Sequence, residues 1–420
     1  YVRGMITMTQ FSYMHLGEEA DPATDVVCKY RVTTELPMEK AAEAIAAEQS
    51  TGTWTELSTL SADTMKNYGA RVLAIEGDLV TIAFPDVDFS IKVGGIPQIL
   101  SVVSGNLYGL DALQKVRLED IHFSRSIQAQ FKGPRFGADG LRELVGRPEK
   151  PLIGTIVKPK IGLSPKETAN YVYEAGAGGL TNSKDDETLV DQSFCPMQDR
   201  TLAIAESLDK LAEEGHKMIH AINVSTNGDK IVEVAERAQS WGAKQLMVDV
   251  ITCGFAAVQA LAEDPSIKVP IHVHRTMHGA MTKDIRHGIA MLPIVKMTRM
   301  CGGDALHIGT LGAGKMTGDI QGDRDNLNAC LDPLEPYRTV MPVCSGGVYP
   351  GMLAKMIEET GFNVQIQAGG GVAGHPGGVR KGAMAMTQAV NGLFSGFTLQ
   401  EYAKKHEELA QALEKWGIKE

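Results

Sequence analysis

The sequence predicts an α/β protein in which an N-terminal ferredoxin-like α+β domain precedes a C-terminal (β/α)8 TIM barrel. At 420 residues the chain is too long for one ordinary domain. A stretch with several prolines lies at 133–151. After it, the sequence contains eight short apolar runs, and helical patterns lie in most of the intervals between them. We therefore expect the first domain at 20–140, the barrel at 141–395 and a helical tail at 396–420.

The first domain is expected to have the element order βαββαβ, which is typical of a ferredoxin-like sandwich. An Ala/Glu-rich segment predicts a helix, and Glu76-Gly77-Asp78 separates two apolar runs like the turn of a hairpin. The expected strands are 26–34, 71–75, 79–84 and 115–123, and the expected helices are 38–48 and 96–104. This order by itself says nothing about function.

The eight apolar runs of the second domain are expected to be buried parallel strands, at 152–157, 178–183, 217–224, 245–251, 269–275, 305–310, 342–346 and 364–369. After the first run, Ser164-Pro165-Lys166-Glu167 has the pattern of a helix capping box with proline at the first helical position. Eight strands separated by helices favour a barrel over an open doubly wound sheet. The open sheet is the alternative, although no G-x-G-x-x-G follows the first strand. A helix at 399–416 is expected to close the chain.

Composition argues against several classes of partner. The net charge of −10 disfavours nucleic acid, whose phosphates need a basic face. No stretch approaches about eighteen uninterrupted apolar residues, and the first residues lack the pattern of a secretion signal, so we expect no membrane partner. The six cysteines lie far apart without a C-x-x-C pair, which argues against a zinc site or a disulfide framework. We expect buried free thiols and a cytoplasmic protein.

The candidate site residues follow the predicted strands, where a TIM barrel builds its active site. They are Lys158-Pro159-Lys160, Lys184-Asp185-Asp186-Glu187, His272-Val273-His274-Arg275, His307 with Lys315 in the next loop, Ser345-Gly346-Gly347 and Gln367-Ala368-Gly369-Gly370-Gly371. The glycines after the last two strands occupy the common phosphate site of the fold, although tight turns would also explain them. Arg275 and His307 would hold a second phosphate, or else form an ordinary ion pair and a satisfied core histidine. The cluster as a whole favours an elongated phosphorylated sugar.

Asp186 and Glu187 offer the hard oxygen ligands that Mg²⁺ prefers. Lys184 is expected on the same side of its strand as Asp186, because side chains alternate along a strand. One interpretation of this group is a salt bridge without a metal. The other is that CO2 adds to the lysine amine and forms a carbamate, which supplies a further anionic oxygen. The K-x-D-E pattern alone leaves both open.

Several motifs of the chain, taken together and in order, resemble the large subunit of ribulose-1,5-bisphosphate carboxylase (RuBisCO). They are Glu48-Gln49-Ser50-Thr51-Gly52-Thr53-Trp54, Gly105-Asn106, Gly154-Thr155-Ile156-Val157-Lys158-Pro159-Lys160, Lys184-Asp185-Asp186-Glu187, His272-Val273-His274-Arg275, Ser345-Gly346-Gly347 and the segment 367–376. The resemblance runs from about residue 25 to the end of the chain. The short C-terminus is similar to that of the archaeal, form III enzymes.

The resemblance implies a role for each of these residues. Lys184 would carry a carbamate formed from activating CO2 and would bind Mg²⁺ together with Asp186 and Glu187. Lys158 would protonate the product carbanion, and His274 would be a second proton-transfer group. The substrate-binding residues would be Lys160 beside Lys158; Arg275, His307 and Ser345 at one phosphate; Gly347, Gly369, Gly370, Thr53, Trp54 and the catalytic Lys315 at the other end; Gly346 and Gln367; and Glu48 and Asn106 from a partner subunit.

The implied activity is carboxylation of D-ribulose 1,5-bisphosphate by CO2 to two molecules of 3-phosphoglycerate, with an oxygenase side reaction that consumes O2. By the same resemblance the enzyme would serve archaeal AMP degradation, as a homodimer or an oligomer of dimers without a small subunit. Two alternatives are a RuBisCO-like enolase or isomerase of sulfur salvage and a non-catalytic sugar-phosphate binder. Against the first, Lys158, His274, His307 and Lys315 are all present.

The chain departs from the family pattern in three places. Thr181-Asn182 stands where the family usually has Asp-Phe ahead of the lysine, and this puts the support of Lys184 in question. Ile156 stands where plant enzymes have a threonine near the substrate. The loop at 310–315 is one residue longer than in plant enzymes.

Overall fold

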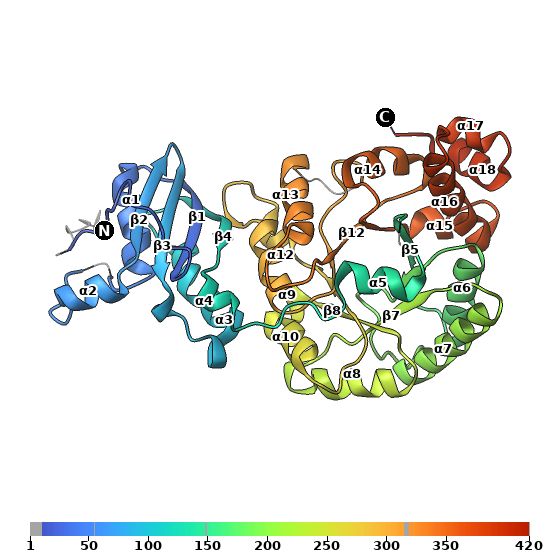
Figure 1. Ribbon diagram of the computed structural model, residues 1–420, viewed down its shortest axis with the longest axis horizontal. Coiled ribbons are helices and arrows are strands. Elements are labelled where there is room, and N and C mark those ends of the chain that lie inside the picture. The colour runs from blue at the N-terminus through green and yellow to red at the C-terminus, as the bar shows by residue number, and fades with distance from the viewer. Residues whose placement is uncertain (1–10, 54, 148, 315–318, 420) are drawn as a thin grey trace. The chain divides into compact units, whose positions relative to one another are not determined.

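The computed structural model describes residues 11–53, 55–147, 149–314 and 319–419 (Figure 1). The chain divides into two compact units. The first unit contains Tyr1–Phe131 and Met277–Met297, and the second contains Lys132–Thr276 and Thr298–Glu420. Most of the segment between the fifth and sixth barrel strands in chain order therefore belongs to the first unit.

The first unit is built on a sheet with the strand order β10-β4-β1-β3-β2. Its elements are β1 Asp25–Thr33, α1 Met38–Glu48, α2 Ala62–Tyr68, β2 Arg71–Glu76, β3 Leu79–Pro85, α3 Ile91–Val103, β4 Lys115–His122, α4 Arg125–Gln128, α11 Gly279–Thr282 and β10 Gly288–Ile289. Strand β1 pairs antiparallel with both β3 and β4, and β2 pairs antiparallel with β3. The predicted ferredoxin-like order is thereby confirmed.

Two features of this unit were not predicted. Strand β10 extends the sheet by pairing parallel with β4, and α2 follows the first helix. Helix α3 also begins five residues before the predicted helix at 96–104, and Gly95 interrupts it with a φ of 53°. A positive φ of this kind is readily adopted only by glycine, so the sequence allows a kink here that an apolar run conceals.

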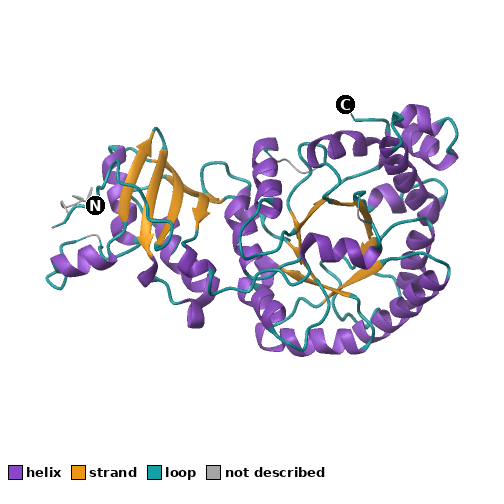
Figure 2. Cartoon of the chain, viewed as in Figure 1, coloured by secondary structure: helices purple, strands orange, loops and turns teal. Residues whose placement is uncertain are grey.

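The second unit contains a closed barrel with the strand order β11-β12-β13-β5-β6-β7-β8-β9. Its strands are β5 Leu152–Ile156, β6 Asn182–Lys184, β7 Ile219–Asn223, β8 Gln245–Asp249, β9 Ile271–His274, β11 Ala305–His307, β12 Met341–Ser345 and β13 Gln365–Gln367. All strand pairs in the barrel are parallel, and Figure 2 shows the ring that they form inside a layer of helices. The predicted TIM barrel is confirmed, and the open sheet is excluded.

Helices precede the first barrel strand, lie in the intervals between the strands and follow the last strand. They are α5 Gly137–Val145, α6 Pro165–Ala177, α7 Met197–Glu213, α8 Ile231–Ser240, α9 Val250–Cys253, α10 Phe255–Glu263, α12 Met291–Met300, α13 Ile320–Leu331, α14 Leu353–Thr360, α15 Gly370–Ala373, α16 Gly378–Phe394, α17 Leu399–Ala403 and α18 Glu407–Trp416. The capping box at the start of α6 is confirmed, because Ser164 and Glu167 exchange side-chain and backbone hydrogen bonds. The tail predicted as one helix at 399–416 is instead two helices, α17 and α18.

Most predicted strands extend beyond the observed ones, by one to four residues. The largest shift is in the second barrel strand, which was expected at 178–183 and lies at Asn182–Lys184. Gly179 before it has a φ of 95°, so this part of the apolar run is a turn. Five of the six cysteines are buried free thiols as predicted, and Cys253 is half-buried. No helix among the described residues is long and apolar enough to cross a membrane.

Candidate active site

Seven of the eight barrel strands end in a polar side chain at the carboxyl end of the barrel. These terminal residues are Lys184, Asn223, Asp249, His274, His307, Ser345 and Gln367. In the remaining strand, β5, Lys158 follows two residues after the end. Because parallel strands bring these ends to one face, the barrel gathers the residues that the sequence analysis singled out. Asn223 and Asp249 complete the ring but were not predicted.

Lys184 is almost completely buried at the end of β6. Its Nζ donates a hydrogen bond of 2.9 Å to the Asp185 carbonyl and lies 3.5 Å from Glu187 Oε2. Burial lowers the pKa of the Lys184 amine, although the carboxylates of Glu187 and Asp186 act in the opposite direction. The net direction favours the neutral amine, which is the form that can add CO2.

Asp186 and Glu187 lie at the same centre as a lysine and a histidine side chain. Lys158 Nζ lies 2.6 Å from Asp186 Oδ2, and His274 Nε2 lies 3.7 Å from Glu187 Oε2. The Lys184 amine and the His274 ring help to hold the pKa of Glu187 at about 2, against the effect of burial. Glu187 therefore remains a carboxylate near neutral pH, and the side-chain oxygens of both acids are available as ligands. Among the described residues no group of three or more His, Cys, Asp or Glu side chains is placed to hold a metal ion.

Asp185, between the two predicted ligands, belongs to a separate buried network. Its carboxylate lies 3.2 Å from Arg200 Nη2 and 3.1 Å from His220 Nε2, and it accepts the Asn223 backbone N–H. Arg200 and His220 hold the pKa of Asp185 at about 2 although the side chain is fully buried. This network anchors the chain at the end of β6, where Lys184 and Asp186 must be placed. Sequence analysis missed Arg200 and His220, which are distant in sequence and have no motif.

Asp249 orients the predicted proton-transfer residue. Its Oδ1 lies 3.0 Å from His274 Nδ1, which also lies 3.1 Å from the Thr276 backbone nitrogen, and these two contacts turn Nε2 of the ring toward Glu187. The signal that could have identified Asp249 was its position, since it is a polar residue inside the apolar run 245–251. Asn223 has the same signal, and its amide donates to the Glu187 and Leu189 carbonyls.

Arg275, His307 and Ser345 also lie together. His307 Nδ1 is 2.8 Å from Ser345 Oγ, and its Nε2 is 2.8 Å from His272 Nε2. The Arg275 guanidinium donates to the Ile308 carbonyl, directly after His307. Burial lowers the pKa of Arg275 to about 10, which leaves it cationic at neutral pH. Burial is the main influence on this pKa, and the Asp323 carboxylate acts in the opposite direction.

The predicted phosphate-binding glycines follow β12 and β13. Gly346 and Gly347 have φ values of 113° and 80°, so they form a tight turn that favours glycine. Gly369 lies close to the predicted acid, because a Cβ there would be 3.0 Å from Lys158 Cε. Gly370 begins the short helix α15. A tight turn and a phosphate cradle are both compatible with this backbone, so the phosphate role stays a prediction.

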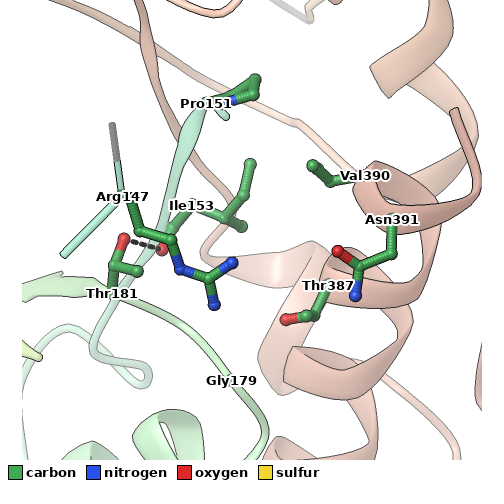
Figure 3. Close-up of a pocket in the computed structure, with 8 residues that line it drawn as sticks. All are labelled: Arg147, Pro151, Ile153, Gly179, Thr181, Thr387, Val390 and Asn391. Atoms are coloured by element: carbon green, nitrogen blue, oxygen red, sulfur yellow. Dashed lines mark hydrogen bonds between the residues drawn. The ribbon is translucent and has the colours of Figure 1, made fainter. Parts of the chain in front are cut away.

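A cavity of about 370 Å³ opens beside Glu187 and Asp249. Its lining includes Glu187, Thr188, Asp249 and Thr276, which come from three strand ends and the loops after them. A second, much smaller pocket lies at the start of β5, with about 10 Å³ of space, roughly enough for a single water molecule. Figure 3 shows the Arg147 side chain pointing into it beside Thr387 and Asn391. None of the predicted site residues lines this smaller pocket.

Several predicted residues are not brought to the barrel centre by the described contacts. Glu48, Thr53 and Asn106 belong to the first unit, where Glu48 ends α1 and Asn106 follows α3. Lys160 is in the second unit and is exposed in the loop after β5. Trp54 and Lys315 lie outside the described residues.

The departures at Thr181 and Asn182 have a local structural explanation. Thr181 Oγ1 donates to the Ile153 carbonyl or to Asn182 Oδ1, and both side chains are buried. The Asn182 Nδ2 has no hydrogen-bond partner among the described residues. Neither side chain is hydrogen-bonded to Lys184 among the described contacts. The Lys184 amine instead donates a hydrogen bond to the backbone carbonyl of its neighbour Asp185.

The chain matches two family models. Residues 137–416 match the ribulose bisphosphate carboxylase large chain, catalytic domain, and residues 12–127 match the N-terminal domain of the same large chain. A ribulose bisphosphate carboxylase from Methanocaldococcus jannaschii is 39% identical over 405 residues, which cover 90% of this chain and 94% of the relative. One from Pyrococcus furiosus is 38% identical over 385 residues, covering 90% of this chain and 91% of the relative.

Solved structures give the same result. The octameric ribulose-1,5-bisphosphate carboxylase/oxygenase from Pyrococcus horikoshii, in complex with a sulfate ion, has a TM-score of 0.90 at 36% identity, with 97% of each chain covered. A dimeric archaeal Rubisco from Hyperthermus butylicus has a TM-score of 0.87 at 33% identity, covering 97% of this chain and 99% of that one. The resemblance inferred from the motifs is confirmed.

Proposed function

Because the chain belongs to the ribulose bisphosphate carboxylase large-chain family, we propose that it carboxylates D-ribulose 1,5-bisphosphate with CO2. The products are two molecules of 3-phosphoglycerate. The observation that carries the proposal is the meeting of Lys184, Asp186, Glu187, Lys158 and His274 at one end of the barrel. A sugar-phosphate binder would need neither the carboxylate pair nor two separate proton-transfer groups.

Mg²⁺ would be held by Asp186, Glu187 and a carbamate on Lys184. The donor set fits this ion, because Asp186 and Glu187 offer hard oxygen ligands and the carbamate adds the anionic oxygen that an amine cannot supply. When bound, the ion supplies Lewis-acid stabilisation of negative charge on the substrate oxygens. The burial that lowers the pKa of the Lys184 amine favours carbamate formation, since only the neutral amine adds CO2.

Lys158 and His274 are assigned the proton transfers. Lys158, on its cis-proline turn and beside Asp186, would deliver the proton to the carbanion left when the C2–C3 bond breaks. His274, with its ring oriented by Asp249, would be the second proton-transfer group. Lys160 would support Lys158.

Two anion sites would hold the substrate at its ends. Arg275, His307 and Ser345 would hold one phosphate group. The other end would be bound by Gly347, Gly369, Gly370, Thr53, Trp54 and Lys315, with Gly346 and Gln367 contributing to the same pocket and Glu48 and Asn106 supplied by a partner chain. Lys315 would also bind the incoming carboxylate.

The finer properties are proposed on the family resemblance. O2 would attack the same enediolate, giving an oxygenase side reaction, and AMP degradation would supply the bisphosphate. The assembly would be a homodimer or an oligomer of dimers in the cytoplasm, without a small subunit. We also propose that the chain is organised as domains at 20–140 and 141–395 with a tail at 396–420, in addition to its division into two compact units.

The deciding experiment is a product assay with ribulose bisphosphate, labelled bicarbonate and Mg²⁺. Labelled 3-phosphoglycerate is expected, and activity should rise after preincubation with bicarbonate and Mg²⁺. Removal of the metal with EDTA should abolish the product, and Mg²⁺ together with bicarbonate should restore it. Absence of labelled product from folded, preincubated protein would reject the carboxylase, and enolisation of a thio-sugar phosphate would then identify a RuBisCO-like enolase.

A further inference from the structure

Three side chains on neighbouring barrel strands form a hydrogen-bonded chain that ends at the candidate anion site. His272 on β9 lies with its Nε2 2.8 Å from Nε2 of His307 on β11. His307 Nδ1 in turn lies 2.8 Å from Oγ of Ser345 on β12. His272 is fully buried, His307 nearly so, and Ser345 is partly exposed at the outer end of the chain.

Both imidazole rings are neutral near pH 7. Burial lowers the pKa of His272 and of His307 well below the ordinary value. A neutral imidazole carries one N–H and one lone pair. The contact between the two Nε2 atoms therefore contains a single proton, which belongs to one ring or the other.

The two possible placements have different costs. If His307 donates to His272, the proton of His272 must sit on Nδ1, which is buried and has no partner among the described residues. A buried N–H without an acceptor is rare in folded proteins, because it loses its hydrogen bond to water without replacement. If His272 donates instead, its N–H is satisfied and only a lone pair on Nδ1 lacks a partner. The second placement is favoured.

We propose that His272 is a positioning residue which makes Ser345 a hydrogen-bond donor to a phosphate group of the substrate. With His272 donating from Nε2, the proton of His307 must lie on Nδ1, where it is donated to Ser345 Oγ. The Ser345 hydroxyl proton is then directed away from His307 and is available to an anion. His307 acts through Ser345, because both of its ring nitrogens are already occupied. This inference rests on the proposed function for the identity of the anion.

The first test reads the tautomers directly in the wild-type protein. Enzyme labelled with 15N-histidine is expected to show His272 protonated at Nε2 and His307 protonated at Nδ1, with assignments made from the variants His272→Gln and His307→Gln. A proton on His272 Nδ1 would overturn the proposal. This measurement depends on neither turnover nor the identity of the substrate.

The second test measures binding of inorganic phosphate to the Mg²⁺- and bicarbonate-treated protein. His272→Phe keeps a planar ring but removes the donor, so the Kd for phosphate should rise roughly tenfold or more, as expected for loss of a hydrogen bond to a charged group. His272→Gln retains an N–H at a similar reach and should recover most of the affinity. In a Ser345→Ala background His272→Phe should add little, because the two residues act in series. Unchanged binding in His272→Phe, or full additivity with Ser345→Ala, would overturn the proposal.

A matched control and the carboxylase assay separate this proposal from its premise. His375→Gln alters another buried histidine of the barrel unit, which contacts the Glu408 carbonyl, and should leave phosphate binding unchanged. If carboxylation fails while the tautomer and phosphate results hold, the proposed function is wrong and the anion site stands. If carboxylation is observed while His272→Phe binds phosphate normally, only the positioning role is wrong.

Discussion

The two sheets of this protein use polar residues in opposite ways. In the first unit, β1 is nine residues long, and its inward side chains Val26, Cys28, Tyr30 and Val32 are buried and largely apolar. The barrel strands contain only three to five residues, and seven of them end in a polar side chain. The first sheet is therefore arranged for packing, whereas the barrel gives up part of its apolar interior to a site.

Unpartnered polar atoms show the cost of that arrangement. Among the described residues, five barrel-strand side chains contain a buried nitrogen or oxygen without a hydrogen-bond partner: Asn182, Gln245, His272, Gln365 and Gln367. The first sheet has two such side chains, Thr33 and Arg117. Buried polar groups without partners destabilise a fold, so the barrel strands bear more of this cost than the first sheet does. Substitutions in the two sheets should then have opposite signatures.

The largest expected loss of activity is that caused by Lys184→Met. Carboxylation should fall to background because no carbamate can form, while the thermal unfolding midpoint should stay the same or rise, since a buried amine is replaced by an apolar chain of similar length. Activity and thermal unfolding would be measured on the same preparations. Lys29→Met, at an exposed position of β1, is the control and should leave activity unchanged. Full activity in Lys184→Met would refute the carbamate.

The next prediction tests whether one active site is formed by the first unit of one chain and the second unit of another. Glu48→Ala and Lys184→Ala should each be inactive, yet co-expression should restore measurable activity, because a mixed dimer has one site with both lesions and one with neither. The assay is carboxylation by a purified heterodimer carrying two different tags. A verified heterodimer that remains inactive would show that each site is formed by a single chain.

A smaller loss of activity is expected from Asp249→Asn. The His274 ring would lose its carboxylate acceptor, and kcat should fall roughly 10- to 100-fold, the range typical when a partner that orients a functional histidine is removed. Stability should change little. Asp209→Asn, at an exposed position of α7, provides the comparison and should have full activity. A wild-type kcat in Asp249→Asn would show that His274 needs no orientation.

The smallest effect on activity is expected from a core substitution in the first sheet. Ile82 on β3 is fully buried, so Ile82→Val should lower the free energy of unfolding by about 1 kcal/mol. Activity per folded molecule should be unchanged, because no polar strand end is touched. Denaturant unfolding and carboxylation at saturating substrate would be measured together. A large loss of activity without loss of stability would contradict the division between the two sheets.

Much of the fold was predictable because local patterns specify it. The helix at 38–48 was predicted with the bounds that the structure has, and Ser164 and Glu167 form the predicted capping box. The eight apolar runs are strands, since buried parallel strands need continuous apolar sequence. Their ends were less predictable, because residues such as Gly179 turn the chain while remaining within an apolar run. The division of the tail into α17 and α18 escaped prediction for a similar reason, because its apolar spacing continues across the turn at 404–406.

What the sequence determined by itself was the identity and order of the chemical groups: a lysine and two acids after one strand, and histidines after two others. Only the tertiary structure decided which of them interact. Asp249 is paired with His274, and Arg200 and His220 anchor Asp185, across 15 to 35 residues of chain. His272 reaches Ser345 through His307. The physical reason is that strand alternation fixes the side on which a residue points, whereas its partner depends on which strands become neighbours when the barrel closes.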